Sequence, residues 1–371
     1  MSIDCVGKRK MLLVCSIVII TIFMINSPEQ LLAVISGECS NCHTMHNSQN
    51  GAVMVDYTYG SETSDAQEYL LRGTCLGCHA QGGPGMVATV SGNDVPQVYH
   101  TDATGDLAGG NFAYILGTKG TGASDNKGHN VVDFGNVENT LSGPPGHHTP
   151  STLGVNLTCA GIRGCHGVRH SQIGGIQGSH HKNVDGKLTV ADEPSNSYRF
   201  LMGVQGLEDP DWQKTKSASD HNEYFGATTP MTYLGNCDIC HHATGIYPDN
   251  GTISGLCGTC HRDFHVTDGI GGDTLSPFTR HPTDVILPGG TTEYAAYNGA
   301  GNPYSFLAPV ARTTVPDTPG STVSPGTDAI MCLSCHSAHA SDYDDMMRWD
   351  YRSATLSTAI SGCSICHTSK D

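Results

Sequence analysis

One short motif, Cys-x-x-Cys-His, recurs six times in this 371-residue chain and constrains its structure more than any other feature. The two thiols of such a motif bond covalently to a porphyrin, and the adjacent histidine binds the iron. A longer variant, with five residues between its cysteines, occurs once. The sequence therefore predicts seven haem c groups, or six if the long variant binds none. The predicted thioether residues are Cys39, Cys42, Cys75, Cys78, Cys159, Cys165, Cys237, Cys240, Cys257, Cys260, Cys332, Cys335, Cys363 and Cys366, and the predicted proximal iron ligands are His43, His79, His166, His241, His261, His336 and His367.

Zinc binding is the main alternative role for these cysteines. The pairs Cys237–Cys240 and Cys257–Cys260 have a separation that a zinc ribbon allows. A histidine follows every cysteine pair directly, however, and zinc does not require this arrangement. The pattern therefore favours haem.

The long variant, Cys159 to His166, has a second interpretation. Its cysteines could form a disulfide that closes a short loop in an oxidising compartment. Alternatively, Gly161 and Gly164 could let the longer loop bulge outward and leave the two thiols at the spacing that haem needs. An intact mass would decide between these readings, because the number of bound haems is an integer.

The histidine content indicates how the irons are ligated. Of twenty histidines, seven are proximal by position, and the thirteen that remain can supply a second imidazole to every haem. Iron with two imidazoles has no open position for a substrate, which suits electron transfer and not catalysis. An enzyme of the multihaem nitrite or hydroxylamine type needs an open position, and no Cys-x-x-Cys-Lys motif occurs here. The predicted distal ligands are His46, His100, His129, His170, His221, His265, His281 and His339.

The composition predicts little regular structure. Apolar residues make up 37% of the chain and aromatic residues 6%, with 46 glycines and 18 prolines. Apolar periodicity is short throughout, so we expect mostly irregular coil, short helices at the haem motifs and little sheet. Flat apolar haems would supply much of the missing core. We expect one multihaem domain over residues 34–371, in which 182–236 form a haem-free insertion or packing arm.

The first 33 residues predict export. Three basic residues, 8–10, precede an apolar run of fifteen residues, 11–25, and a small residue follows at Ala33. This pattern is typical of a secretory signal peptide, and a retained anchor is the alternative. The predicted destination is extracellular or the cell surface, reached through the periplasm, with no membrane span in the mature form.

The charge of the chain restricts the kinds of molecule that it can bind. The formal charge is −16, and residues 1–33 carry three basic and two acidic side chains, so cleavage would leave −17. Such an acidic surface disfavours nucleic acid and anionic membranes. We expect redox partners and extracellular electron acceptors instead.

Several motifs together resemble a known family. They are Glu38 to Ser48, Lys127-Gly128-His129-Asn130, Arg280-His281-Pro282, and Cys332 to Ser341 with Met347-Arg348 after it. They are similar to motifs of the six-haem, OmcS-type extracellular cytochromes of metal-reducing bacteria, which polymerise into conducting filaments. The resemblance implies stacked bis-histidine haems in a filament of identical subunits. It also implies that His46 binds a haem of the neighbouring subunit, the one held there by Cys332, Cys335 and His336.

The chain departs from the six-haem pattern at two places. The motif Cys237–His241 is additional, and the third motif is regular in the family but long here. The distal ligand of the additional haem stays open among His221, His242 and the pair His180–His181. We predict a seven-haem cytochrome that polymerises head-to-tail and passes electrons by hopping to external acceptors. The alternatives are a non-polymeric periplasmic or cell-surface electron carrier and, less favoured, a multihaem oxidoreductase.

Overall fold

The computed structural model describes most of the chain from residue 74 onward and isolated parts before it. The described residues are 38, 40, 43–46, 48–49, 52–53, 70, 74–90, 92–135, 141, 143–146, 157–161, 163–169, 186–228, 248, 250–261, 264, 281–290 and 292–369. The predicted signal peptide, Cys39, Cys42 and the motif at 237–241 lie outside these residues. Within the described part, no helix is long and apolar enough to cross a membrane.

Helices are few and short, as the composition predicts. The α-helices are α2 (Cys75–His79), α5 (Ile253–Gly258), α6 (Leu356–Ala359) and α7 (Cys363–Cys366). Short 3-10 helices are η2 (Phe112–Tyr114), η3 (Asp125–Lys127), η4 (Val132–Phe134), η6 (Pro194–Asn196), η7 (Tyr198–Phe200), η9 (Cys332–Ser334) and η10 (Asp344–Met346). Four of these helices, α2, α5, η9 and α7, contain cysteines of a haem motif. The prediction of short helices at the motifs is therefore confirmed for the regular motifs described in full.

Threonine side chains start two of the motif helices. The hydroxyl of Thr74 accepts a hydrogen bond from the amide of Leu76 at the start of α2. Thr252 does the same for the amide of Gly255 at the start of α5. Such caps satisfy amides that a helix leaves without partners, and they matter most in helices of one or two turns.

The sheet content is small but organised. The strands are β1 (Ser48–Gln49), β2 (Ala52–Val53), β3 (Val87–Val90), β4 (Asn93–Pro96), β5 (Lys187–Leu188), β6 (Gly206–Leu207), β7 (Glu223–Phe225), β8 (Val285–Ile286), β9 (Ala311–Arg312) and β10 (Ala329–Ile330). Two pairs form antiparallel hairpins, β1–β2 and β3–β4. The other strands form one sheet in the order β5-β6-β7-β9-β10-β8, antiparallel except between β7 and β9. Residues 186–228, in the stretch predicted as an insertion or packing arm, supply β5, β6 and β7.

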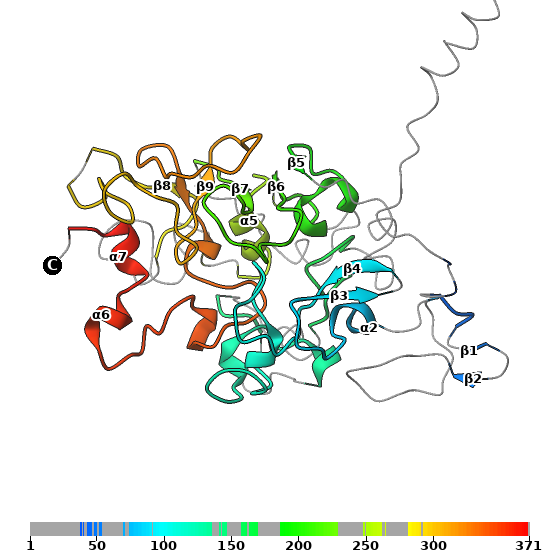
Figure 1. The fold of residues 1–371 in the computed structure, drawn as a ribbon. Helices are drawn as coiled ribbons and strands as arrows, with labels where there is room; N and C mark the ends of the chain where they lie inside the picture. The colour runs from blue at the N-terminus through cyan, green and yellow to red at the C-terminus, as the bar shows by residue number, and fades with distance from the viewer. Residues whose placement is uncertain are drawn as a thin grey trace, which may run out of the picture.

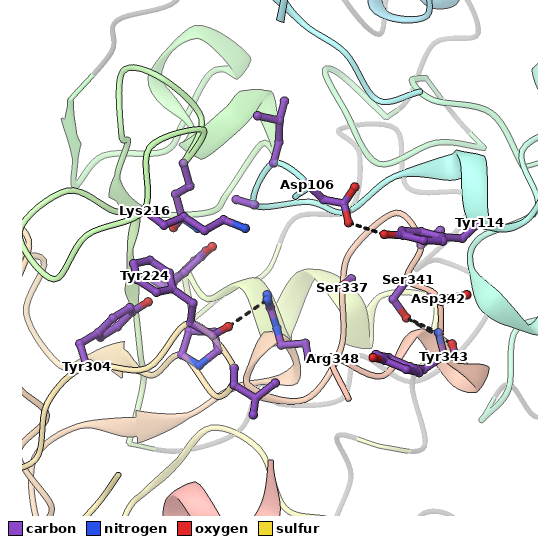
Figure 2. Close-up of a pocket in the computed structure, with 18 residues that line it drawn as sticks. Asp106, Tyr114, Lys216, Tyr224, Tyr304, Ser337, Ser341, Asp342, Tyr343 and Arg348 are labelled. Carbon is purple, nitrogen blue, oxygen red and sulfur yellow. Dashed lines mark hydrogen bonds between the residues drawn. The ribbon is translucent and has the colours of Figure 1, made fainter. Parts of the chain in front are cut away.

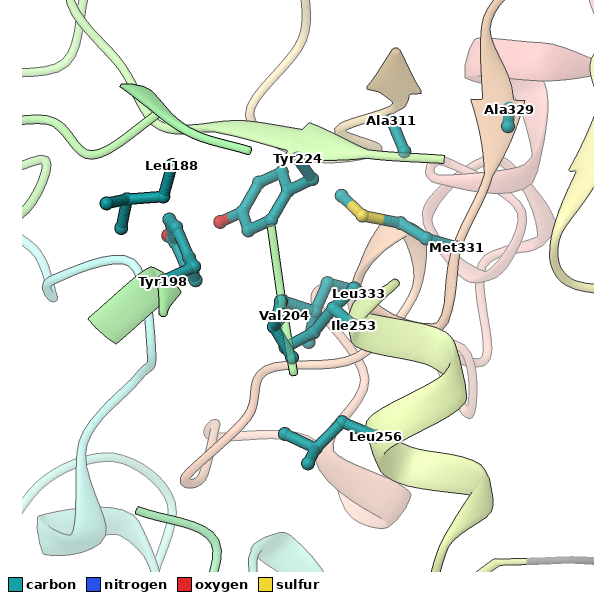
Figure 3. Close-up of a cluster of buried hydrophobic side chains, with 10 residues drawn as sticks. All are labelled: Leu188, Tyr198, Val204, Tyr224, Ile253, Leu256, Ala311, Ala329, Met331 and Leu333. Carbon is teal, nitrogen blue, oxygen red and sulfur yellow. The ribbon is translucent and has the colours of Figure 1, made fainter. Parts of the chain in front are cut away.

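The largest apolar cluster joins this sheet to two haem motifs (Figure 3). Tyr224 comes from β7, whereas Ile253 and Leu256 come from α5 and Leu333 from η9. The hydroxyl of Ser254 also accepts a hydrogen bond from the amide of Cys332. The sheet therefore fixes the α5 motif and the η9 motif against each other.

The motif helices are spread across the molecule. Figure 1 shows α2, α5 and α7 in this order from one side of the molecule to the other. The β1–β2 hairpin lies beyond α2, and α6 lies beside α7 at the opposite end. These three motif helices therefore follow one another across the molecule in chain order.

Candidate haem sites

Thiols of different haem motifs interact with one another. The thiol of Cys75 is hydrogen-bonded to that of Cys159, and the thiol of Cys257 to that of Cys332. Cys165 and Cys260 are near enough to interact electrostatically, as are Cys335 and Cys366. These interactions link five of the motifs in chain order, and the motif at 237–241, which lies between two of them in the sequence, is outside the described residues.

A proximal histidine must present one ring nitrogen to the iron and anchor the other. A carbonyl or carboxylate oxygen can only accept, so it holds the proton on Nδ1 and leaves Nε2 for a metal. The histidines of these five motifs all have Nδ1 within hydrogen-bond distance of such an oxygen. These contacts are His79 with Pro96 O at 2.9 Å, His166 with Arg199 O at 3.0 Å, His261 with Pro145 O at 2.8 Å, His336 with Asp345 O at 2.7 Å and His367 with Glu293 Oε1 at 2.6 Å.

Local structure supplies the acceptor for His79. The β3–β4 hairpin ends at Pro96, whose carbonyl faces the ring of His79. The side chain of the next residue, Gln97, donates to Cys78 O at 2.9 Å and accepts from the amide of Gln81 at 2.8 Å. The hairpin therefore holds the motif of α2 from two sides.

Three motif histidines face a second histidine from a distant part of the chain. The ring centroids are 6.2 Å apart for His166 and His339, 6.1 Å for His261 and His129, and 6.3 Å for His367 and His281. A metal–imidazole bond is about 2 Å long and its nitrogen lies about 1.2 Å from the ring centre, so two imidazoles on opposite sides of one metal ion have centroids roughly 6.3 Å apart. The three pairs thus fit the two axial positions of a haem iron.

The distal histidines of these pairs are in the protonation state that binds metal. Burial lowers the pKa of His129 to about 4 and that of His339 to about 3, with nearby imidazoles adding to each effect. Burial also lowers the pKa of His281. In addition, Nδ1 of His129 donates to Ala338 O at 2.8 Å, and Nδ1 of His281 to Pro282 O at 2.9 Å. Neutral imidazoles with an anchored Nδ1 suit iron ligation through Nε2.

Two other predicted distal ligands occupy a different environment. His100 and His221 are completely buried. Nε2 of His100 lies 3.6 Å from Asp106 Oδ1, and Nε2 of His221 lies 3.3 Å from Glu223 Oε1. Among the described residues, the structure does not bring either ring against a motif histidine. The ring of His221 instead stacks on Tyr304, with centroids 3.9 Å apart.

The remaining candidates lie near the N-terminus or outside the described residues. The side chain of His46 is exposed, and its φ of 52° places it in a left-handed turn just before the β1–β2 hairpin. The neighbouring Met45 is 72% exposed. His170 and His265 lie outside the described residues, as do His242 and the pair His180–His181.

The long motif has the same internal hydrogen bond as the regular motifs. In those, the histidine amide donates to the carbonyl of the first cysteine, as His261 does to Cys257 at 2.8 Å. In the long motif, His166 donates to Cys159 O at 3.1 Å. The extra residues loop out between them, with Gly161 at a φ of 83°. The thiol of Cys159 interacts with that of Cys75 and donates a 3.9 Å hydrogen bond to Asp133 Oδ2, and it forms no disulfide with Cys165.

A cavity of about 410 Å³ lies beside the segment that carries His339. Figure 2 shows Lys216, Arg348 and the hydroxyls of Tyr224 and Tyr304 around it. Across the cavity, Tyr114 donates a 2.7 Å hydrogen bond to Asp106. Cations and hydroxyls of this kind are suitable partners for carboxylates. Sequence patterns did not single out this group, because its members come from separate segments.

Comparisons with known proteins agree with the motifs. Residues 324–371 match the family model described as a doubled CXXCH motif. The chain is 28% identical, over 384 aligned positions, to the C-type cytochrome OmcS of Geobacter sulfurreducens, covering 88% of this chain and 82% of that protein. The resemblance predicted from the motifs is thereby confirmed.

Two solved structures are also similar to the chain. One is the outer membrane cytochrome S filament from Geobacter sulfurreducens, with 20% identity and a TM-score of 0.46, and the other is of OmcS nanowires from the same organism, with 19% identity and a TM-score of 0.46. In both cases the match covers 91% of this chain and 100% of the other chain.

Proposed function

We propose that this chain is a multihaem c-type cytochrome that assembles head-to-tail into an extracellular filament and conducts electrons to external acceptors. It acts in electron transfer and is not an enzyme. When bound, each haem supplies a one-electron iron couple, which two imidazoles keep low-spin and closed to substrates. The protein places these groups in one row and fixes the orientation of their ligands.

The spacing of the histidine pairs is the observation that carries this proposal. Three pairs of rings stand 6.1 to 6.3 Å apart, and each joins one motif histidine to one predicted distal ligand. We assign His339 to the haem of His166, His129 to that of His261 and His281 to that of His367. Thiol contacts between successive motifs support a continuous row of haems.

We further propose that the number of haems is seven. The retained hydrogen bond between His166 and Cys159 supports haem at the long motif, and the contact of Cys159 with Cys75 argues against a Cys159–Cys165 disulfide. The intact mass of the purified protein tests the number directly. Seven added haems support the proposal. Six haems in wild type, unchanged in a Cys159→Ser and Cys165→Ser double variant, would remove the long motif from the set.

The ends of the subunit support head-to-tail polymerisation. The exposed His46 and Met45 precede the β1–β2 hairpin, which lies at the end opposite to α6 and α7 (Figure 1). Leu356, which is 72% exposed, lies on α6. OmcS forms filaments in its solved structures, and the 28% identity across most of this chain supports the same assembly here. His46 would then bind the haem held by Cys332, Cys335 and His336 in the next subunit.

Substitution of His46 tests this assembly. We expect His46→Ala to abolish filaments in negative-stain images while the haem number by intact mass stays that of wild type. Lys187→Ala, which removes a side chain at the start of β5 that pairs with the exposed Asp317, serves as the control and should leave filaments intact. Wild-type protein that stays monomeric would favour the non-polymeric carrier. Filaments that persist in His46→Ala would refute ligation between subunits.

A further inference from the structure

Three segments that are far apart in the sequence meet around Ala340. Gly128 pairs with Ala340 in an antiparallel bridge, and Gly110 pairs with it in a parallel bridge from the other side. His129 N donates to His339 O at 3.0 Å, and His339 N donates to Gly109 O at 2.7 Å. These segments include two of the motifs that carry the family resemblance. We call residues 109–111, 127–129 and 338–342 the bridge unit.

The bridge unit carries two distal histidines in adjacent positions. His129 lies directly opposite His339 in the antiparallel pairing. The ring of His129 also donates from Nδ1 to Ala338 O at 2.8 Å. One ring nevertheless faces His261 and the other faces His166. A single stretch of backbone, Ala338–His339, therefore positions the distal ligands of two different haems.

The approach of the three segments leaves no room for a Cβ at Gly110, whose φ is 87°, or at two further glycines. A Cβ at Gly128 would lie 2.5 Å from the Cβ of Ala340 and 2.6 Å from His339 O. A Cβ at Gly109 would lie 2.8 Å from Nδ1 of His339, so it would press on the imidazole itself. Neither glycine has a left-handed backbone, so the restriction is one of space and not of φ. Packed interiors cannot absorb such overlaps without a shift of the neighbours.

An ion pair and an aromatic ring hold the unit in place. Lys127 is 5% exposed, and its Nζ lies 3.0 Å from Asp342 Oδ1 and 2.8 Å from Thr121 Oγ1. This contact joins the second segment to the third. Phe112 follows the first segment and stacks on the ring of His339, with centroids 5.0 Å apart and an interplanar angle of 25°. Side chains locked in this way preserve the orientation of a ligand.

We propose that the bridge unit positions two distal imidazoles at once, one for the Cys159–Cys165 haem and one for the Cys257–Cys260 haem. This inference rests on the proposed function, because it assumes haem at both motifs. Gly109, Gly128 and Lys127 are then positioning residues that act through His129 and His339. A change at the shared backbone alters the ligand field of both haems, whereas a change at Gly109 alters only one.

Electron paramagnetic resonance of the oxidised, full-length cytochrome tests the proposal, with intact mass as the measure of haem content. We expect Gly109→Ala to shift the low-spin signal of one haem, and Gly128→Ala to shift the signals of two, each quantified against the total haem. The matched control is Gly105→Ala, because a Cβ at Gly105 meets nothing within 4 Å. It should give the wild-type spectrum. A merely structural role would change yield or stability and leave the signals of the folded protein unchanged.

A variant that adds no side chain to the crowded glycine positions allows the test even if the glycine variants fold poorly. Lys127→Gln removes the ion pair to Asp342 and should perturb the same two signals together. The proposal is overturned if Gly109→Ala and Lys127→Gln match the Gly105→Ala spectrum at equal haem content, or if Lys127→Gln affects one signal alone. The spectra report ligation inside one subunit, so a loss of filaments leaves this test intact. Wild type without low-spin bis-imidazole signals would instead refute the proposed ligation itself.

Discussion

The six-stranded sheet and the row of haem motifs are stabilised in different ways. The sheet region is stabilised by apolar clusters, which it shares with α5, η9 and α7, and by a buried ion network in which Arg312 binds both Glu223 and Asp328. The motif row instead contains buried neutral imidazoles and helices of three to six residues. Helices this short are not stable by themselves. The comparison indicates that the sheet is held by protein contacts, whereas the row depends on its covalent cofactors.

Removal of one haem should break the row and produce the largest effect. In a Cys257→Ser and Cys260→Ser double variant, we expect one haem fewer and a fall in unfolding free energy of more than about 4 kcal/mol. The reason is that His129 and His261 stay buried without the metal that joins them. Intact mass and denaturant unfolding measure the two effects. An unfolding free energy equal to that of wild type would contradict the dependence of the row on its cofactors.

Removal of the central cation should break the sheet and leave the haems in place. Arg312→Met removes the cation from Glu223, whose side chain is fully buried, and from Asp328. It leaves these carboxylates with the amides of Gly320 and Ser324. A broken buried pair typically costs about 3–5 kcal/mol. Haem number and the low-spin spectrum should match wild type, in contrast to the cysteine variant. The exposed Arg352, which pairs with Asp344, provides the control, and Arg352→Met should change stability little.

The same substitution in both regions sharpens the comparison. Leu76 lies in the α2 motif and Leu287 in the cluster beside β8, and each is 1% exposed. Leucine-to-alanine changes at such sites cost about 2–5 kcal/mol. We expect similar losses of unfolding free energy for Leu76→Ala and Leu287→Ala. Leu76→Ala should alter the haem absorption spectrum more than Leu287→Ala, because Leu76 lies within a motif whereas the cluster of Leu287 only borders Ile365 and Cys366 of the α7 motif. Equal changes in both variants would argue against different modes of stabilisation.

Acid should lower the unfolding free energy through the bridge unit by a smaller amount. We expect less than about 1 kcal/mol, because the ion pair that is lost is partly exposed. Burial raises the pKa of Asp342, but hydrogen bonds from Thr121 and Lys127 outweigh it, so the pKa lies below the ordinary 3.8. A depressed carboxyl pKa stabilises the folded state above 3.8 and loses this effect as the pH falls through the lower folded value. The difference in unfolding free energy between wild type and Asp342→Asn should therefore persist at neutral pH and shrink below pH 3.8. A constant difference would contradict this assignment.

Parts of the fold follow from the sequence and parts do not. The short helices at the motifs were predicted correctly, because haem attachment fixes where they occur. The six-stranded sheet was not predicted, because strands of two or three residues are too short to show an alternating pattern. The Glu223–Arg312–Asp328 network also escaped prediction, since its members lie on separate strands and nearby loops.

The sequence by itself predicted the attachment sites that we propose for haem. A thioether pair and its proximal histidine are adjacent along the chain, so a local pattern such as Cys75 to His79 is sufficient to identify them. The partner of each proximal histidine is a different matter. The tertiary structure alone decided that His339 faces His166, because these residues meet through long-range packing around Ala340. Covalent chemistry is local in sequence, whereas the second axial position is filled by whichever imidazole the fold brings there.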